Sequence, residues 1–118
     1  MSPERLSSVL LVEDDVIIAM DVSAMIQELG SPRVVTASSP ADALRILDDE
    51  TPTAAVLDVR LGQQTSEAVA HALRSKGVPF VLATGVDEDE ELNDFPDAPI
   101  LRKPFGAAML RASLDALS

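Results

Sequence analysis

Side chains that can bind a metal ion or take part in a reaction follow several apolar runs of the sequence, at points where strands of a sheet would end. Carboxylates held close together repel one another, so they need a cation or a proton to coexist. Oxygen ligands with room for water suit Mg²⁺ best, and an ammonium or hydroxyl group can stabilise a bound oxyanion. A carboxylate can also attack phosphorus, as in aspartyl-phosphate chemistry. The groups are Glu13, Asp14 and Asp15 after residues 8–12, Asp58 after 54–57, Thr84 and Gly85 after 78–83, and Lys103 and Pro104 after 99–102.

Asp58 stands alone after its apolar run, so it is the predicted nucleophile, and Glu13 and Asp14 are the predicted metal ligands. Each residue also has a simpler structural explanation. Asp58 could cap a turn, and Asp15 fits the start of a helix, where negative charge suits the helix dipole. The hypothesis of phosphoryl chemistry therefore depends on all of these strand ends meeting at one edge of one sheet.

Apolar runs alternate five times with helical patterns along the chain. This alternation predicts an α/β fold, a doubly wound five-stranded parallel sheet of order 2-1-3-4-5 with about five helices on its two faces. Ligands of such sheets bind at the carboxyl ends of the strands. The expected strands span residues 8–12, 33–37, 54–57, 78–83 and 99–102, and the expected helices span 16–29, 40–50, 66–77 and a segment carrying Ala107, Leu110, Leu114 and Leu117. Ser39 and Ser66 are the predicted N-caps of two of these helices.

The remaining helix, expected between residues 86 and 97, is the exception to this pattern. Seven of the chain's twenty acidic residues lie between Asp87 and Asp97, and only Leu92 and Phe95 there are apolar. Helices in proteins gain most of their stability from packing an apolar face. The sequence therefore predicts a short or mobile helix, with the alternative that phosphorylation or a partner orders it.

The chain has 118 residues, which predicts one domain spanning 1–118 and no output domain. Its formal charge of −11, with the basic residues scattered, argues against a nucleic acid partner. There is no cysteine, no apolar run long enough to span a membrane, and no apolar core of a signal peptide near Met1. We expect a cytoplasmic protein that is a monomer or a weak dimer.

Over nearly its whole length the chain resembles response-regulator receiver domains of two-component signalling. The matching motifs are the acidic pair Glu13-Asp14 after an apolar strand, Asp58 after Ala-Ala-Val-Leu, Thr84 after Phe-Val-Leu-Ala, and Lys103-Pro104-Phe105. Each motif is weak alone, and together, in order and at the right strand ends, they are specific.

The resemblance implies a role for each matching residue. Asp58 would accept a phosphoryl group from a histidine kinase or a phosphotransfer protein, and an unknown downstream protein would read the signal. Mg²⁺ would be bound directly by Asp14 and through water by Glu13, with Asp58 also among its ligands. The backbone carbonyl of Arg60 would complete the protein's share of the ligands. Thr84 and Lys103 would contact the phosphoryl oxygens, and the Lys103–Pro104 peptide bond would be cis.

The sequence departs from the usual receiver pattern at the position of the aromatic switch residue, which is Ile100 here. The stretch 79–85 is similar to a subgroup of alphaproteobacterial receivers with a Phe-Ala-Thr-Gly motif, which often consist of a single domain. Two departures from that motif are Leu82 in place of the Phe and no Tyr after Gly85.

Two other functions fit parts of the sequence. The missing aromatic at Ile100 favours a phosphorylation-independent interaction module, a pseudo-receiver on the same fold. Haloacid-dehalogenase enzymes also use a nucleophilic aspartate, but they need a second acid where this chain has Arg60. We expect no enzyme activity beyond slow self-dephosphorylation. His71 lies in a predicted helix with no partner motif, so a solvated histidine is the prediction there.

Overall fold

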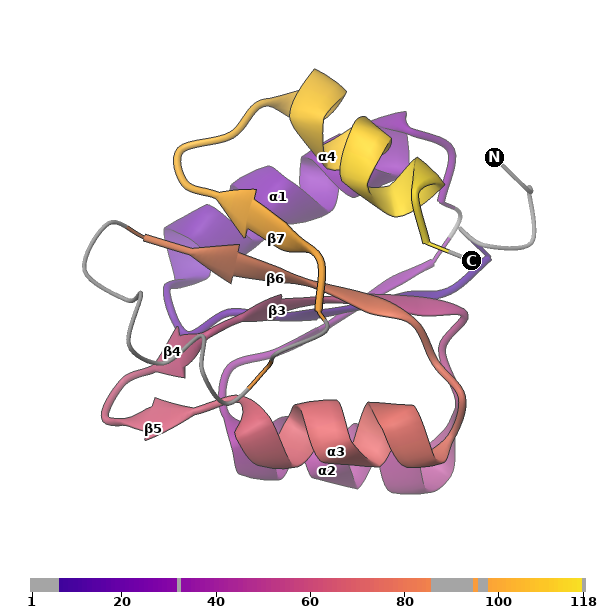
Figure 1. Ribbon diagram of the computed structural model, residues 1–118, viewed down its shortest axis with the longest axis vertical. Coiled ribbons are helices and arrows are strands. Elements are labelled where there is room, and N and C mark those ends of the chain that lie inside the picture. Colours follow the sequence, from indigo (N-terminus) through magenta and orange to yellow (C-terminus); the bar gives the residue numbers. More distant parts are fainter. Residues whose placement is uncertain (1–6, 32, 86–94, 96–97, 118) are drawn as a thin grey trace.

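The computed structural model describes residues 7–31, 33–85, 95 and 98–117. Five parallel strands form one sheet in the order β2-β1-β3-β6-β7 (Figure 1). The predicted order 2-1-3-4-5 is therefore confirmed. The strands are β1 (Val9–Val12), β2 (Val34–Ala37), β3 (Ala54–Asp58), β6 (Phe80–Thr84) and β7 (Ile100–Arg102).

Helices cover both faces of the sheet, and the described residues form two of them on each side (Figure 1). On one face lie α1 (Val16–Glu28) and α4 (Ala107–Asp115), and on the other lie α2 (Pro40–Asp49) and α3 (Glu67–Ser75). The expected helix within residues 86–97 falls outside the described residues, apart from Phe95, which is buried against the face covered by α2 and α3. Among the described helices, none has both the length and the apolar composition to cross a membrane.

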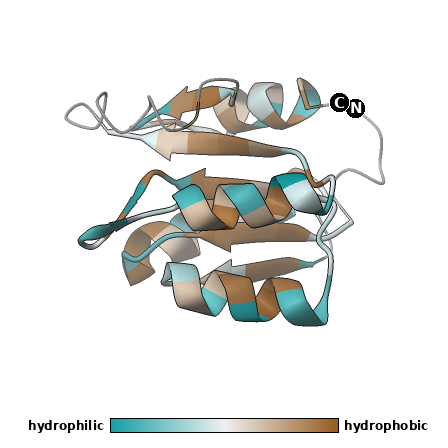
Figure 2. Ribbon diagram, turned by 60° about the horizontal axis from the view of Figure 1, so that its bottom comes forward, coloured by the Kyte–Doolittle hydropathy of each residue, from teal (hydrophilic) through white to brown (hydrophobic). Residues whose placement is uncertain are grey.

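The core forms two layers because successive side chains of a strand point to opposite faces of the sheet. In β1, Leu10 and Val12 pack toward α2 and α3, whereas Val9 and Leu11 pack toward α1 and α4. Figure 2 shows the strands as hydrophobic ribbons and the helices as mixed, with hydrophilic residues among hydrophobic ones. A strand covered on both faces has no hydrophilic side, which is why these segments read as continuous apolar runs.

Two caps follow the sequence-based prediction and one does not. Asp15 accepts hydrogen bonds from the backbone N–H groups of Ile17 and Ile18, and Ser39 accepts one from Asp42 at 3.1 Å. Ser66 occupies the N-cap position of α3, but its side chain makes no capping bond. Its backbone, at φ −89° and ψ 17°, differs from the extended conformation from which N-cap side chains bond.

The sequence did not predict the short hairpin that follows β3. Its strands are β4 (Arg60–Leu61) and β5 (Gln64–Thr65), paired antiparallel. Gly62 lies in the turn at φ +65°, a left-handed conformation that glycine adopts at low cost. Leu61 is buried, and the Ser66 N–H donates to the Val59 carbonyl at 3.0 Å, so the hairpin is fastened at its base.

Candidate functional site

The carboxyl ends of β1, β3 and β7 bring the predicted site residues to one edge of the sheet. Glu13 follows β1, Asp58 ends β3, and Lys103 follows β7. All three strands are parallel members of one sheet, so these ends point the same way. A cavity of about 310 Å³ at this edge is lined by Glu13, Asp14, Asp58, Arg60, Gly62 and Lys103, among others.

Three carboxylates meet in this cavity. Glu13, Asp14 and Asp58 each offer one oxygen, and these oxygens all lie within 4.8 Å of one another. Glu13 and Asp58 are buried, whereas Asp14 is exposed, so the cluster is open to water on one side. An all-oxygen donor set with an open side fits a hard divalent cation that retains water, which is the preference of Mg²⁺.

Lys103 supplies the positive charge of the site. Its Nζ lies 2.7 Å from Asp58 Oδ1 and 3.5 Å from Glu13 Oε2. The contact with Asp58 is an ion pair without the direction of a hydrogen bond, since Asp58 Oδ1 accepts no well-directed hydrogen bond from the described residues. One ammonium therefore lies close to two buried carboxyl groups and offsets the negative charge of whichever of them is ionised.

Glu13 holds its proton far more strongly than an ordinary glutamate. Burial, together with the hydrogen bond and the negative charge of Asp58, raises the pKa of Glu13 from 4.5 to about 8. Lys103 acts in the opposite direction, and the charge of Asp14 adds to the rise. A bound cation reverses this effect because its charge favours the ionised carboxylate. Without a cation, Glu13 is largely neutral at pH 7 and relieves the repulsion within the cluster.

A hydrogen bond from the β4–β5 hairpin holds the side chain of Asp14 in place. The backbone N–H of Gly62 donates a hydrogen bond to Asp14 Oδ2 at 2.9 Å, between residues 48 positions apart in the sequence. Sequence reasoning missed this group because a backbone amide carries no residue-type signal. A glycine at position 62, four residues after Asp58, is compatible with a turn but does not indicate a contact with Asp14.

The other residues predicted for the site differ in their positions and in their exposure to solvent. Arg60 begins the hairpin two residues after Asp58, and its side chain is exposed. Thr84 is fully buried at the end of β6, and its hydroxyl donates to the Gly85 carbonyl at 3.0 Å. The Lys103–Pro104 peptide bond is cis, in agreement with the expectation. Ile100 begins β7 and is 42% exposed.

His71 lies away from the cluster. It is exposed on α3, which covers the sheet, and it is not among the residues that line the cavity. This placement agrees with the prediction of a solvated histidine.

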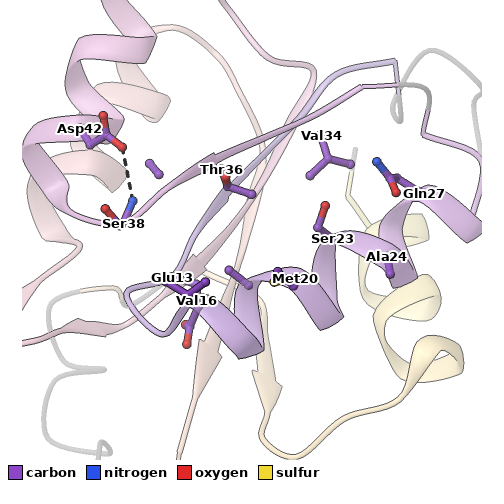
Figure 3. A pocket seen from close by; sticks show the side chains of 12 residues that line it. Glu13, Val16, Met20, Ser23, Ala24, Gln27, Val34, Thr36, Ser38 and Asp42 are labelled. Carbon is purple, nitrogen blue, oxygen red and sulfur yellow. Dashed lines mark hydrogen bonds between the residues drawn. The ribbon is translucent and has the colours of Figure 1, made fainter.

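A second hollow adjoins the site. A groove of about 530 Å³ runs between α1 and β2, and its lining mixes small or polar side chains such as Ser23, Ala24 and Thr36 with larger apolar ones such as Met20 and Val34 (Figure 3). Glu13 lines one end of it, so the groove reaches the edge of the carboxylate cluster. Sequence reasoning missed this groove, because it forms where residues of two separate elements, α1 and β2, face each other.

Comparison with known proteins places similar chains beside this one in sequence and in fold. The family model of the response regulator receiver domain matches residues 9–115. The solution structure of SdrG from Sphingomonas melonis Fr1 has 38% sequence identity and a TM-score of 0.84, and 98% of each chain is covered. The BeF3-activated conformation of SdrG, from Pseudomonas melonis Fr1, has 37% identity and a TM-score of 0.78, with 94% of this chain and 95% of SdrG covered.

A curated relative is longer than this chain. The phyllosphere-induced regulator PhyR of Methylorubrum extorquens is 27% identical over 116 residues, which are 95% of this chain and 43% of PhyR. The chain thus spans less than half the length of PhyR.

Proposed function

This chain belongs to the response regulator receiver domain family of two-component signalling, and we propose that Asp58 accepts a phosphoryl group from a histidine kinase or phosphotransfer protein. Receiver domains are generally signalling modules and not enzymes, and no enzyme family is indicated for this chain. The phosphorylated form would then act on a partner protein, with at most slow self-dephosphorylation.

One observation carries this proposal. Asp58 lies at the end of the central strand, with Glu13 and Asp14 oxygens within 4.8 Å and the ammonium of Lys103 at 2.7 Å. A nucleophilic carboxylate, oxygen ligands for a cation and a fixed ammonium are the parts that phosphoryl transfer requires. In the reaction, an Asp58 oxygen would form the new bond to phosphorus. The P–N bond of a phosphohistidine donor would break, and its electron pair would return to the imidazole.

Mg²⁺ fits the donor set, and it would neutralise charge on the carboxylates and on the transferred phosphoryl group. We propose that Asp14 and Asp58 bind it directly, that Glu13 binds it through water, and that the backbone carbonyl of Arg60 is a further ligand. Glu13 would have to lose its proton, since its pKa of about 8 describes the protein without a cation.

Thr84 and Lys103 would bind the phosphoryl oxygens. For this role the Thr84 hydroxyl has to turn from the Gly85 carbonyl, to which it now donates. Lys103 has to transfer its ion pair from Asp58 to the incoming oxygens. Both changes replace one interaction with a stronger one, because a phosphoryl group offers three charged or partly charged acceptors.

The test is incubation with acetyl phosphate and Mg²⁺, followed by intact-mass spectrometry. We expect a mass gain of one phosphoryl group, and no gain for Asp58→Asn. Asp15→Asn is the matched control, because Asp15 is the neighbouring acid that caps α1 and should leave the gain intact. A gain that persists in Asp58→Asn would place the phosphoryl group elsewhere and contradict the proposal.

A second candidate is a phosphorylation-independent interaction module, which the missing aromatic at Ile100 favours. SdrG, whose BeF3-activated conformation is solved, favours the first candidate. An NMR titration of this chain with Mg²⁺ and beryllofluoride separates the two. Shifts of the amides around Asp58 support phosphoacceptance, whereas amides that do not move support the pseudo-receiver.

A further inference from the structure

We propose that the backbone N–H of Gly62 is a positioning group for the metal site, holding Asp14 in the orientation that binds a divalent cation. The inference rests on the proposed function, because Asp14 is a metal ligand only in that proposal. It assigns a task to the β4–β5 hairpin, which otherwise is merely the connection between β3 and α3.

Asp14 needs such a restraint more than the other carboxylates do. Glu13 and Asp58 are buried, so their surroundings restrict their side chains. Asp14 is exposed, and an exposed side chain loses rotamer freedom when it binds a metal. The hydrogen bond of 2.9 Å from the Gly62 N–H to Asp14 Oδ2 already restricts this side chain. Part of the rotamer entropy is therefore lost before the ion binds. Because Oδ2 accepts this bond, Oδ1 is left for the cation.

The donor itself is fixed by the hairpin. Arg60 pairs with Thr65 and Leu61 with Gln64, so the intervening turn has a defined conformation. Gly62 is at φ +65° in that turn, which directs its N–H toward the β1 end of the sheet. The buried side chain of Leu61 anchors the turn to the core. Only a residue that tolerates a positive φ can keep the amide in this place.

The same hairpin carries the proposed carbonyl ligand of Arg60. Its conformation therefore affects two ligands together, Asp14 through the Gly62 amide and Arg60 directly. Groups that hydrogen-bond to metal ligands orient them, and their loss typically lowers metal affinity by about 10–100-fold. For a solvent-exposed ligand such as Asp14 we expect the lower end of that range.

The test compares two glycines with the same backbone strain. Gly62→Val and Gly77→Val both place a β-branched residue at a positive φ, +65° and +71°, which such residues avoid. A Cβ at residue 77 meets no atom within 4 Å, and at residue 62 the nearest atom is Asp14 Oδ2 at 4.0 Å, so the Cβ itself clashes at neither position. Mg²⁺ affinity is measured by calorimetry on the whole 118-residue chain and on each of its variants.

We expect Gly62→Val to bind Mg²⁺ roughly tenfold more weakly than the wild type, and Gly77→Val to bind it as the wild type does. Gly62→Asn should restore most of the affinity, since asparagine tolerates the left-handed conformation and keeps the N–H. Equal affinity for the wild type and Gly62→Val overturns this inference alone. A wild type that binds no Mg²⁺ overturns the proposed function itself.

A measurement without metal tests the contact independently of these variants. The Gly62 amide should exchange slowly with solvent in the wild type and faster in Asp14→Ala, which removes the acceptor. Amides of the neighbouring α3 should exchange alike in both proteins. A Gly62 amide that exchanges equally fast in both overturns the inference, because the hydrogen bond would then contribute no restraint.

Discussion

Glu13 couples the acidity of the site to the stability of the fold. In the unfolded chain its pKa is near 4.5, and in the folded protein it is about 8. Between these values the folded state keeps a proton that the unfolded state releases. The free energy of unfolding of the metal-free protein therefore falls as the pH rises through this range.

Glu13→Gln should remove this fall in the free energy of unfolding with rising pH. We expect the variant to match the wild type near pH 4 and to be more stable at about pH 8.5, by up to a few kcal/mol, since each pKa unit is worth about 1.4 kcal/mol. Urea unfolding at both pH values, without divalent ions, measures the difference. Glu28→Gln, at an exposed position of α1, is the control and should show no such pH dependence. A Glu13→Gln variant that gains nothing at high pH would show that Glu13 is ionised in the free protein.

Lys103 should matter to folding as well as to phosphoryl binding. Lys103→Met leaves Asp58 and Glu13 buried without their cation, so we expect a loss of roughly 1–3 kcal/mol at about pH 8. Mg²⁺ should restore part of this loss because it replaces the missing positive charge. Thermal unfolding with and without Mg²⁺ gives both numbers.

Lys76→Met is the matched control for that experiment, since Lys76 is exposed at the end of α3. If both lysine variants lose the same stability, or if Mg²⁺ does not stabilise Lys103→Met, then Lys103 does not offset the negative charge of the buried carboxylates.

The charged side chains of the site could be predicted from the sequence, but their protonation and their hydrogen bonds could not. Glu13, Asp58 and Lys103 could be placed together because each follows an apolar run, and parallel strands end at one edge. The raised pKa of Glu13 depends on its burial and its distance from Asp58. The Gly62 amide depends on a hydrogen bond across 48 positions. Neither property has a local signature in the sequence.

Ser39 and Ser66 occupy the same N-cap position of two helices, but the local backbone conformation makes their contributions to stability differ. Ser39→Ala removes the hydrogen bond to the Asp42 N–H and should cost about 1 kcal/mol. Ser66→Ala removes a buried hydroxyl that has no hydrogen-bond partner among the described residues. That substitution should be neutral or slightly stabilising, because an unpaired buried hydroxyl carries a desolvation penalty.

Urea unfolding of the two serine variants tests this contrast, and each serves as the control of the other. Equal losses for Ser39→Ala and Ser66→Ala would mean that Ser66 finds a partner that the structure does not show. The sequence could not separate the two residues, since serine favours both positions. The difference follows from the hairpin, which fastens the Ser66 N–H to the Val59 carbonyl and sets a non-extended backbone.

The overall topology was predictable because three general regularities act together on the whole chain. Continuous apolar runs identify strands covered on both faces, right-handed crossovers place the helices, and the strand ends then share an edge. Small local elements escaped the prediction, namely the two-residue strands at Arg60–Leu61 and Gln64–Thr65. Strands this short carry no periodic pattern. The helix expected within residues 86–97 stays a prediction, since the structure describes only Phe95 of that segment.

The charge of the molecule leads to a last expectation, about its response to cations. At −11 the chain repels itself, so any salt should stabilise it somewhat by screening. Mg²⁺ should do more, because it also occupies the cluster of Glu13, Asp14 and Asp58. A ligand at 100 times its dissociation constant adds about 2.7 kcal/mol to the free energy of unfolding. For a domain of this size that raises the melting temperature by roughly 10 °C.

Specific binding is separated from screening by comparing Mg²⁺ with NaCl at equal ionic strength. We expect the melting temperature to rise with Mg²⁺ in the wild type, and the excess over NaCl to disappear in Asp14→Asn. Asp21→Asn removes the same charge from an exposed position of α1 and should keep the excess. Equal effects of the two salts on the wild type would mean that its acidic cluster responds to ionic strength alone. A persistent excess in Asp14→Asn would mean that Mg²⁺ binds without the carboxylate that Gly62 holds.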